Sequence, residues 1–65
     1  PAYGLEIIER EATATDIGST SQDLLKRGEL LVSVIRDGVS HRFDADTIEI
    51  IETGDRLLLI HQGAK

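Results

Sequence analysis

The side chains with the clearest catalytic potential are two serines and two histidines: Ser33, Ser40, His41 and His61. Nucleophilic catalysis requires a serine within hydrogen-bond reach of a histidine, and many hydrolases place that serine in a Gly-x-Ser-x-Gly turn, which this chain lacks. Ser40 and His41 are neighbours in a segment that we expect to be a β-strand, so their side chains point to opposite faces. The spacing therefore favours solvated polar residues over a catalytic dyad.

Acidic side chains are concentrated in "DADTIE", which begins like a calcium-binding loop with Asp44 and Asp46 at its first and third positions. The sixth position of such a loop is Gly and the twelfth is Glu, whereas this chain has Glu49 and Asp55 there. A looser cation site built from Asp44, Asp46 and Glu49 stays open, but a solvated loop is the favoured interpretation. Two histidines without close spacing are a weak zinc signal, so we predict no metal centre.

Two further patterns have ordinary structural explanations. The stretch "GSTS" precedes an expected helix whose free N-terminus could bind an anion, but capping by Ser19, Thr20 or Ser21 uses the same backbone donors. Glu9 and Glu11 share one strand face, yet a glycosidase needs a sugar-binding cleft that 65 residues can hardly frame. We therefore predict that the chain is not an enzyme and has no catalytic residue and no cofactor.

The composition is that of a small acidic domain. Its 65 residues include 12 Asp and Glu against 7 Lys and Arg, which gives a formal net charge of −5. Phosphate repulsion, and the lack of aromatic residues other than Tyr3 and Phe43, argue against binding to nucleic acid. A chain of this length buries only about 60% of its surface on folding, so small domains often need disulfides, a metal or a partner. Because cysteine is absent, we expect a partner.

The chain starts at Pro1 and contains no Met, so we expect residues 1–65 to be a single domain from a longer protein. No apolar run approaches the ~20 residues of a membrane-spanning helix. Any association with a membrane is therefore expected to come from other parts of that protein.

Strands and one helix follow one another in a pattern typical of an α+β fold. The stretch "STSQDLLKRG" has capping residues at its start, charges of the sign that the helix dipole favours, and Gly28 at its end, so it predicts a short helix. Apolar and β-branched runs predict strands around it, at 5–10, 29–36, 39–43 and 56–61, and a short strand or an irregular edge at 47–51. The expected order is β-α-β-β-β-β, a small, mostly antiparallel sheet with one helix.

The strand expected at 29–36 is apolar on both faces, which is typical of a central strand or of one at an interface. Strict alternation places Leu30, Val32 and Val34 on one face and Leu31 and Ile35 on the other. These five residues form our candidate dimer face.

Two turn dipeptides have a structural role. Asp37-Gly38 tolerates the positive φ angles of a type I′ turn, which predicts a hairpin between the strands at 29–36 and 39–43. Gly54-Asp55 predicts a second turn before the last strand. We assign Asp37, Gly38, Gly54 and Asp55 to structure and not to a binding site.

Four short motifs, in order, resemble the C-terminal domain of regulators of potassium conductance, the RCK or TrkA-C type. A glycine step into the helix is followed by a valine-rich strand ending in a turn, then by an Asp-Thr-x motif and a closing Gly-Asp-x-Leu strand. These motifs are Ile17-Gly18-Ser19-Thr20, the stretch 32–38 ("VSVIRDG"), Asp46-Thr47-Ile48 and the stretch 54–60 ("GDRLLLI"). The resemblance covers almost the whole chain.

This resemblance implies a cytoplasmic regulatory module of a potassium channel or transporter, at the cytoplasmic side of the cell membrane. Such domains follow a Rossmann-type nucleotide-binding subdomain in a protein with a membrane pore, pair as homodimers, and can bind a small effector that shifts gating. Relatives that bind cyclic di-adenosine monophosphate carry Asp-x-Arg and a following Asn. Here Asp23 is followed by Leu24 and Leu25, and the chain has no Asn, so that ligand is not expected. The alternative is a constitutive oligomerisation module without a ligand.

Overall fold

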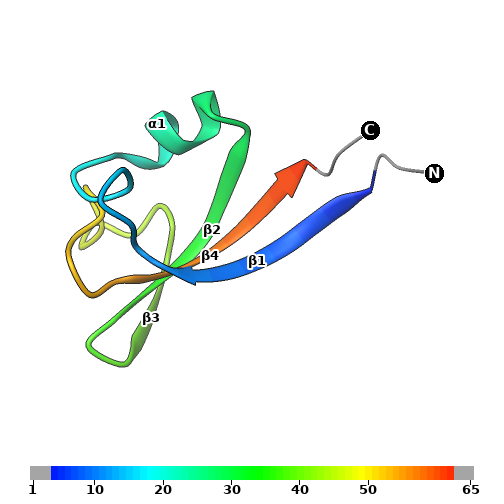
Figure 1. The fold of residues 1–65 in the computed structure, drawn as a ribbon. Coiled ribbons are helices and arrows are strands. Elements are labelled where there is room, and N and C mark those ends of the chain that lie inside the picture. Colours follow the sequence, from blue (N-terminus) through cyan, green and yellow to red (C-terminus); the bar gives the residue numbers. More distant parts are fainter. Residues whose placement is uncertain (1–3, 63–65) are drawn as a thin grey trace.

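The computed structural model describes residues 4–62, which form one antiparallel sheet and one short helix (Figure 1). The elements are β1 (Leu5–Glu11), α1 (Ser21–Lys26), β2 (Glu29–Arg36), β3 (Val39–Arg42) and β4 (Arg56–Gln62). The spatial order of the strands is β1-β4-β2-β3, so the last strand of the sequence lies between the first and the second. The predicted α+β class, with a small antiparallel sheet and one short helix, is confirmed.

The prediction of a strand at 47–51 is wrong, because this part of the chain consists of turns and bends. The side chains of Ile48 and Ile51 are 8% and 1% exposed, and they pack into the core from this irregular segment. Their spacing of three residues does not suit the two-residue alternation of a strand. The backbone of Ile51 is held instead by hydrogen bonds with Gly18 and Ser19, at N–O distances of 2.8 and 2.9 Å.

The helix begins and ends as the sequence predicts. Thr20 is the N-cap, which decides between the three candidate hydroxyls. Its Oγ1 accepts a hydrogen bond from the Asp23 backbone N–H, and the Asp23 carboxylate accepts one from the Thr20 N–H. Gly28, at a φ angle of 84°, follows the last turn in the left-handed conformation that ends a helix. The side chain of Leu24 is fully buried, which docks this two-turn helix on the sheet.

The hairpin between β2 and β3 has the predicted turn. Asp37 and Gly38 have φ angles of 54° and 79°, and both positive values are those of a type I′ turn. Arg36 and Val39 pair directly across it. Gly54 also has a positive φ angle, of 91°, at the predicted turn before β4.

A β-bulge in β2 changes which residues face the core. The register with β4 shifts between Leu31 and Ser33, so that Leu31 lies opposite Leu59 and Val34 opposite Leu57. The extra residue at the bulge breaks the alternation, and the predicted placement of Val34 on the face of Leu30 is therefore wrong. The resulting core consists of Leu24, Leu31, Val34, Ile48, Ile51, Leu57 and Leu59.

Candidate interaction face and adjoining pocket

The residues with catalytic potential are not brought together. The Nδ1 atom of His41 lies 3.1 Å from the Thr47 hydroxyl, whereas Ser40 pairs with Ile35 on the opposite face of the sheet. His61 lies at the end of β4, where its Nδ1 is buried without a hydrogen-bond partner in the described part of the chain. No Ser–His pair with the geometry of a catalytic dyad is among the interactions of these residues.

The acids of the loose cation site do not converge either. Within residues 4–62, no three His, Asp or Glu side chains are arranged to hold a metal ion. Asp44 instead pairs with the guanidinium of Arg42, at an N–O distance of 3.0 Å, and both side chains are largely exposed. This segment is thus a solvated surface loop.

Asp55 has a larger structural role than a turn residue. It is 1% exposed, and its carboxylate accepts hydrogen bonds from Arg36 Nε and Nη2 at 2.9 and 2.7 Å and from the Glu52 N–H at 2.8 Å. The bonds from Arg36, aided by the Glu52 N–H, hold the pKa of Asp55 below its ordinary value despite burial. Arg36 also donates to the backbone oxygens of Thr47 and Ile50. This pair therefore fastens the irregular segment 43–55 to β2.

A second buried ion-pair network joins β1, α1 and β2. Asp16 is 1% exposed and accepts hydrogen bonds from Arg10 and Arg27, and Arg10 also donates to both oxygens of Glu29. Burial acts to raise the pKa of Asp16, but the bonds from Arg10 and from the backbone and hydroxyl of Thr13 outweigh it, and the pKa is lowered. The buried charges are satisfied by one another, so the network has a structural role.

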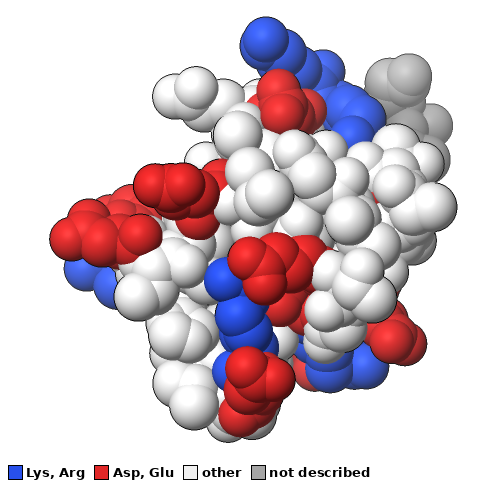
Figure 2. All heavy atoms as spheres, turned by 90° about the vertical axis from the view of Figure 1, so that its left-hand side faces the viewer, with Lys and Arg blue, Asp and Glu red and all other residues white. Residues whose placement is uncertain are grey.

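Oppositely charged side chains also lie next to one another on the surface formed by the connecting segments (Figure 2). The pairs there include Arg36 with Glu52, at an N–O distance of 3.5 Å. No charged group within the two networks is left without a partner of opposite sign. The charges of these two networks are therefore used within the domain, and the candidate functional surface among residues 4–62 is apolar.

The outer face of the sheet, opposite the core, carries exposed apolar side chains. Ile7, Ile60 and Leu30 lie directly opposite one another on β1, β4 and β2, and we call these three residues the apolar row. Ile7 is 76% exposed and Leu30 is 46% exposed, while Leu5, two residues from Ile7 on the same face, is 69% exposed. Nothing among residues 4–62 covers this part of the sheet.

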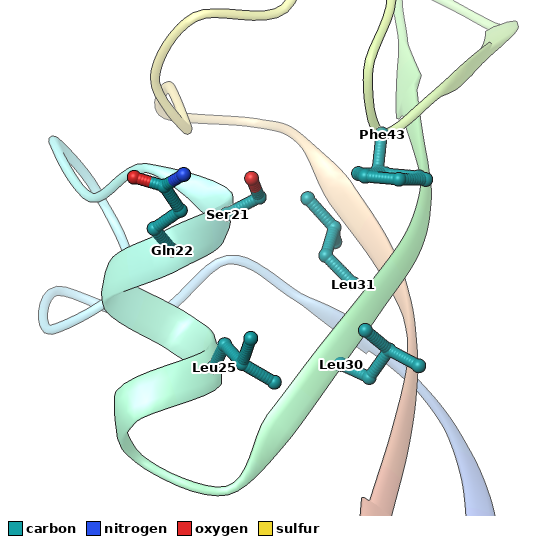
Figure 3. Close-up of a pocket in the computed structure, with 6 residues that line it drawn as sticks. All are labelled: Ser21, Gln22, Leu25, Leu30, Leu31 and Phe43. Carbon is teal, nitrogen blue, oxygen red and sulfur yellow. The ribbon is translucent and has the colours of Figure 1, made fainter.

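A pocket of about 230 Å³ adjoins the apolar row at the edge of β2 (Figure 3). It is bounded by α1, by the first half of β2 and by the residue after β3, and is lined by Ser21, Gln22, Leu25, Leu30, Leu31 and Phe43. Leu30 belongs to both the row and the pocket. Leu25 and Phe43 are 56% and 39% exposed at its rim, so row and pocket form one continuous apolar surface.

Only part of the candidate dimer face is available to a partner. Leu31 and Val34 are buried in the domain's own core and offer no area to a partner, whereas Leu30 is exposed and Val32 and Ile35 are half-buried. The exposed residues of β1 were missed by sequence reasoning. The available signal was the apolar pair Leu5 and Ile7, which share one strand face.

No family model matches this chain, and no curated protein or solved structure was found to match it. The helix of the described part is too short to cross a membrane. The described residues thus form a small α+β domain with a four-stranded antiparallel sheet and an apolar row on its outer face.

Proposed function

We propose that this chain is a regulatory and dimerisation module of a potassium channel or potassium-transport regulator, similar to the RCK C-terminal (TrkA-C) type. In this proposal it works at the cytoplasmic side of the cell membrane, beside a Rossmann-type subdomain and a membrane pore. The observation that carries the proposal is the exposed apolar row with its pocket, because a pairing module must keep such a surface available.

The size of the domain supports pairing. Its core contains few side chains, and two large apolar residues, Ile7 and Leu5, are left 76% and 69% exposed. Burying each of them against a second copy removes apolar area from water at about 25 cal/mol per Å². The domain gains stability from the partner that its own interior is too small to supply.

The motifs that resemble the RCK type coincide with the start of the helix, with turns and with strands. Ile17-Gly18-Ser19-Thr20 leads into α1, the stretch 32–38 covers the second part of β2 and its turn, and the stretch 54–60 covers the turn into β4 and most of that strand. Asp46-Thr47-Ile48 lies in the irregular segment that Arg36 fastens to the sheet. The motifs therefore specify the helix start, the hairpin and the closing strand.

Regulation in such a module is a population shift. An effector that binds one dimer arrangement better than another moves the equilibrium by its difference in affinity, and the moving domains bias the pore. The alternative is a constitutive oligomerisation module that senses nothing. A specific observation favours that alternative: none of the lining residues that the structure describes is charged, so none of them complements a nucleotide phosphate.

Thermal shift with nucleotides and divalent cations separates the two functions. A specific ligand at about 100 times its Kd stabilises a protein by ~2.7 kcal/mol, which for a domain of this size raises the Tm by about 10 °C or more. A sensing module is expected to show such a shift with one ligand class. Unchanged melting with every ligand would leave the constitutive module.

The coding sequence that adjoins this chain tests the parent architecture. We expect a Gly-x-Gly-x-x-Gly strand–helix unit upstream, in a protein or complex with pore helices. An adjoining catalytic domain with no link to a transport protein would contradict the proposal.

A further inference from the structure

We propose that two copies of the domain pair face to face, with Ile7 of one copy seated in the pocket of the other. This inference rests on the proposed dimerisation and adds the arrangement of the two copies. Its basis is the apolar row, which joins Ile7, the most exposed large apolar side chain among residues 4–62, to an apolar pocket.

The register of the sheet makes the row complementary to itself. Ile7 lies at one end on the edge strand β1, Ile60 lies in the middle on β4, and Leu30 lies on β2 at the margin of the pocket. Neighbouring strands are about 4.8 Å apart, so about 10 Å separate Ile7 from Leu30. A two-fold axis parallel to β4 and passing over Ile60 reverses the row and brings Ile7 of one copy opposite the partner's Leu30, at the margin of its pocket.

The pocket suits an aliphatic side chain. Its volume of about 230 Å³ exceeds one side chain but is smaller than the ~300–1,000 Å³ of sites for drug-sized ligands. Leu25, Leu30, Leu31 and Phe43 provide an apolar lining. Leu5 is also exposed, but its row continues only to Gln62 on β4 and does not reach the pocket.

The area of this surface fits a second copy. The exposed parts of Leu5, Ile7, Leu25, Leu30 and Phe43 amount to roughly 500–600 Å², close to the ~600–1,000 Å² per partner that stable dimers bury. Without Leu25 and Phe43 at the pocket rim, the exposed apolar area falls well short of that range. A stable dimer therefore needs the row and the pocket together.

Pairing through the free edge of β1 is disfavoured by charge. Glu6, Glu9, Arg10 and Glu11 occupy four of the seven positions of this strand, which is how natural edge strands avoid pairing. Arg10 is also committed to the buried network with Asp16. On the outer face, Glu9 is paired with Arg56 beside the row, and the row itself is apolar from Ile7 to Leu30, so the contact is face to face along the row.

An effector that enters the pocket competes with the partner's Ile7. Ligand binding and dimerisation are then linked at one site, and each weakens the other by the same factor.

Cysteine cross-linking tests the arrangement, because the chain has no cysteine of its own. Ile7→Cys and Leu25→Cys are made separately, checked for unchanged melting, mixed in equal amounts and oxidised mildly. We expect the mixture to form several-fold more covalent dimer than either variant alone. Val39→Cys, which is 55% exposed on the hairpin and off the row, is the matched control and is expected not to link to Ile7→Cys.

Sedimentation of the unmodified chain, run in parallel, keeps this inference separate from the proposed dimerisation. Dimers with efficient Ile7→Cys self-linking would mean that the axis follows the row, and would overturn the inference while dimerisation stands. Dimers with no cross-link in the mixture would likewise overturn the inference while dimerisation stands. A strict monomer at high concentration would overturn both, and would point to another segment or protein as the occupant of the outer face.

Discussion

Replacement of Asp55 by Asn is the sharpest test of how this small domain is held together. Asn has the shape of Asp but no charge, so Arg36 keeps its position and loses its counter-charge. The side chains of Arg36 and Asp55 are 19% and 1% exposed, so solvent does little to compensate. Removing one partner of a buried pair typically costs 3–5 kcal/mol, and we expect the lower end because Glu52 remains 3.5 Å from Arg36.

A loss of about 3 kcal/mol is large for this chain. Domains have ~0.05–0.15 kcal/mol of stability per residue, which gives about 3–10 kcal/mol for 65 residues. The Tm is expected to fall by more than 10 °C, and the weakest part of the fold is expected to be the segment 43–55, which Arg36 fastens. Thermal and urea unfolding followed by circular dichroism measure both the Tm and the free energy.

The matched control is Asp44→Asn. Asp44 pairs with Arg42 at a similar distance of 3.0 Å, but the two side chains are 49% and 79% exposed. Exposed pairs contribute about 0–1 kcal/mol, so the control is expected to melt within a few degrees of the unmodified chain. Equal effects of the two substitutions would refute the reasoning, because burial would then not decide the worth of the pair.

Three further changes test the turn, the helix cap and the buried acids. Gly38→Val puts a β-branched residue at a φ angle of 79° and is expected to cost about 2 kcal/mol in urea unfolding; an unchanged midpoint would contradict the type I′ turn. Thr20→Ala removes the acceptor for the Asp23 N–H and is expected to cost about 1 kcal/mol, whereas Thr20→Ser keeps a hydroxyl acceptor and is expected to retain most of the stability. The pKa values of Asp16 and Asp55 are lowered below 3.8, so their stabilisation is complete above about pH 5 and is lost as the pH falls through the folded values; melting temperatures constant from pH 6 to pH 2 would contradict this.

The features that the sequence predicts correctly are those that depend on local chemistry. The helix start at Thr20, its stop at Gly28 and the turn at Asp37-Gly38 each depend on a few neighbouring residues and their backbone preferences. These features were predicted because a capping hydroxyl or a glycine acts over only three or four residues. Local patterns also gave the α+β class, since four of the five expected strands form.

The strand predicted at 47–51 failed for a non-local reason. Its isoleucines Ile48 and Ile51 are needed in the core, and the backbone of Ile51 is held there by bonds with Gly18 and Ser19, more than thirty residues away. Apolar composition indicates burial but not the backbone that achieves it. The bulge between Leu31 and Ser33 is similar, because it exists only through pairing with β4.

The sequence by itself determined most of the elements and the acidic character of the chain. Only the tertiary structure decided which residues meet. Placing β4 between β1 and β2 aligns Ile7, Ile60 and Leu30, and the tertiary structure also brings Arg10 to Glu29 and Arg36 to Asp55. These contacts join residues up to 53 positions apart along the chain (Ile7 to Ile60). The candidate interaction face is therefore a product of strand order and register, which act between segments that no local pattern connects.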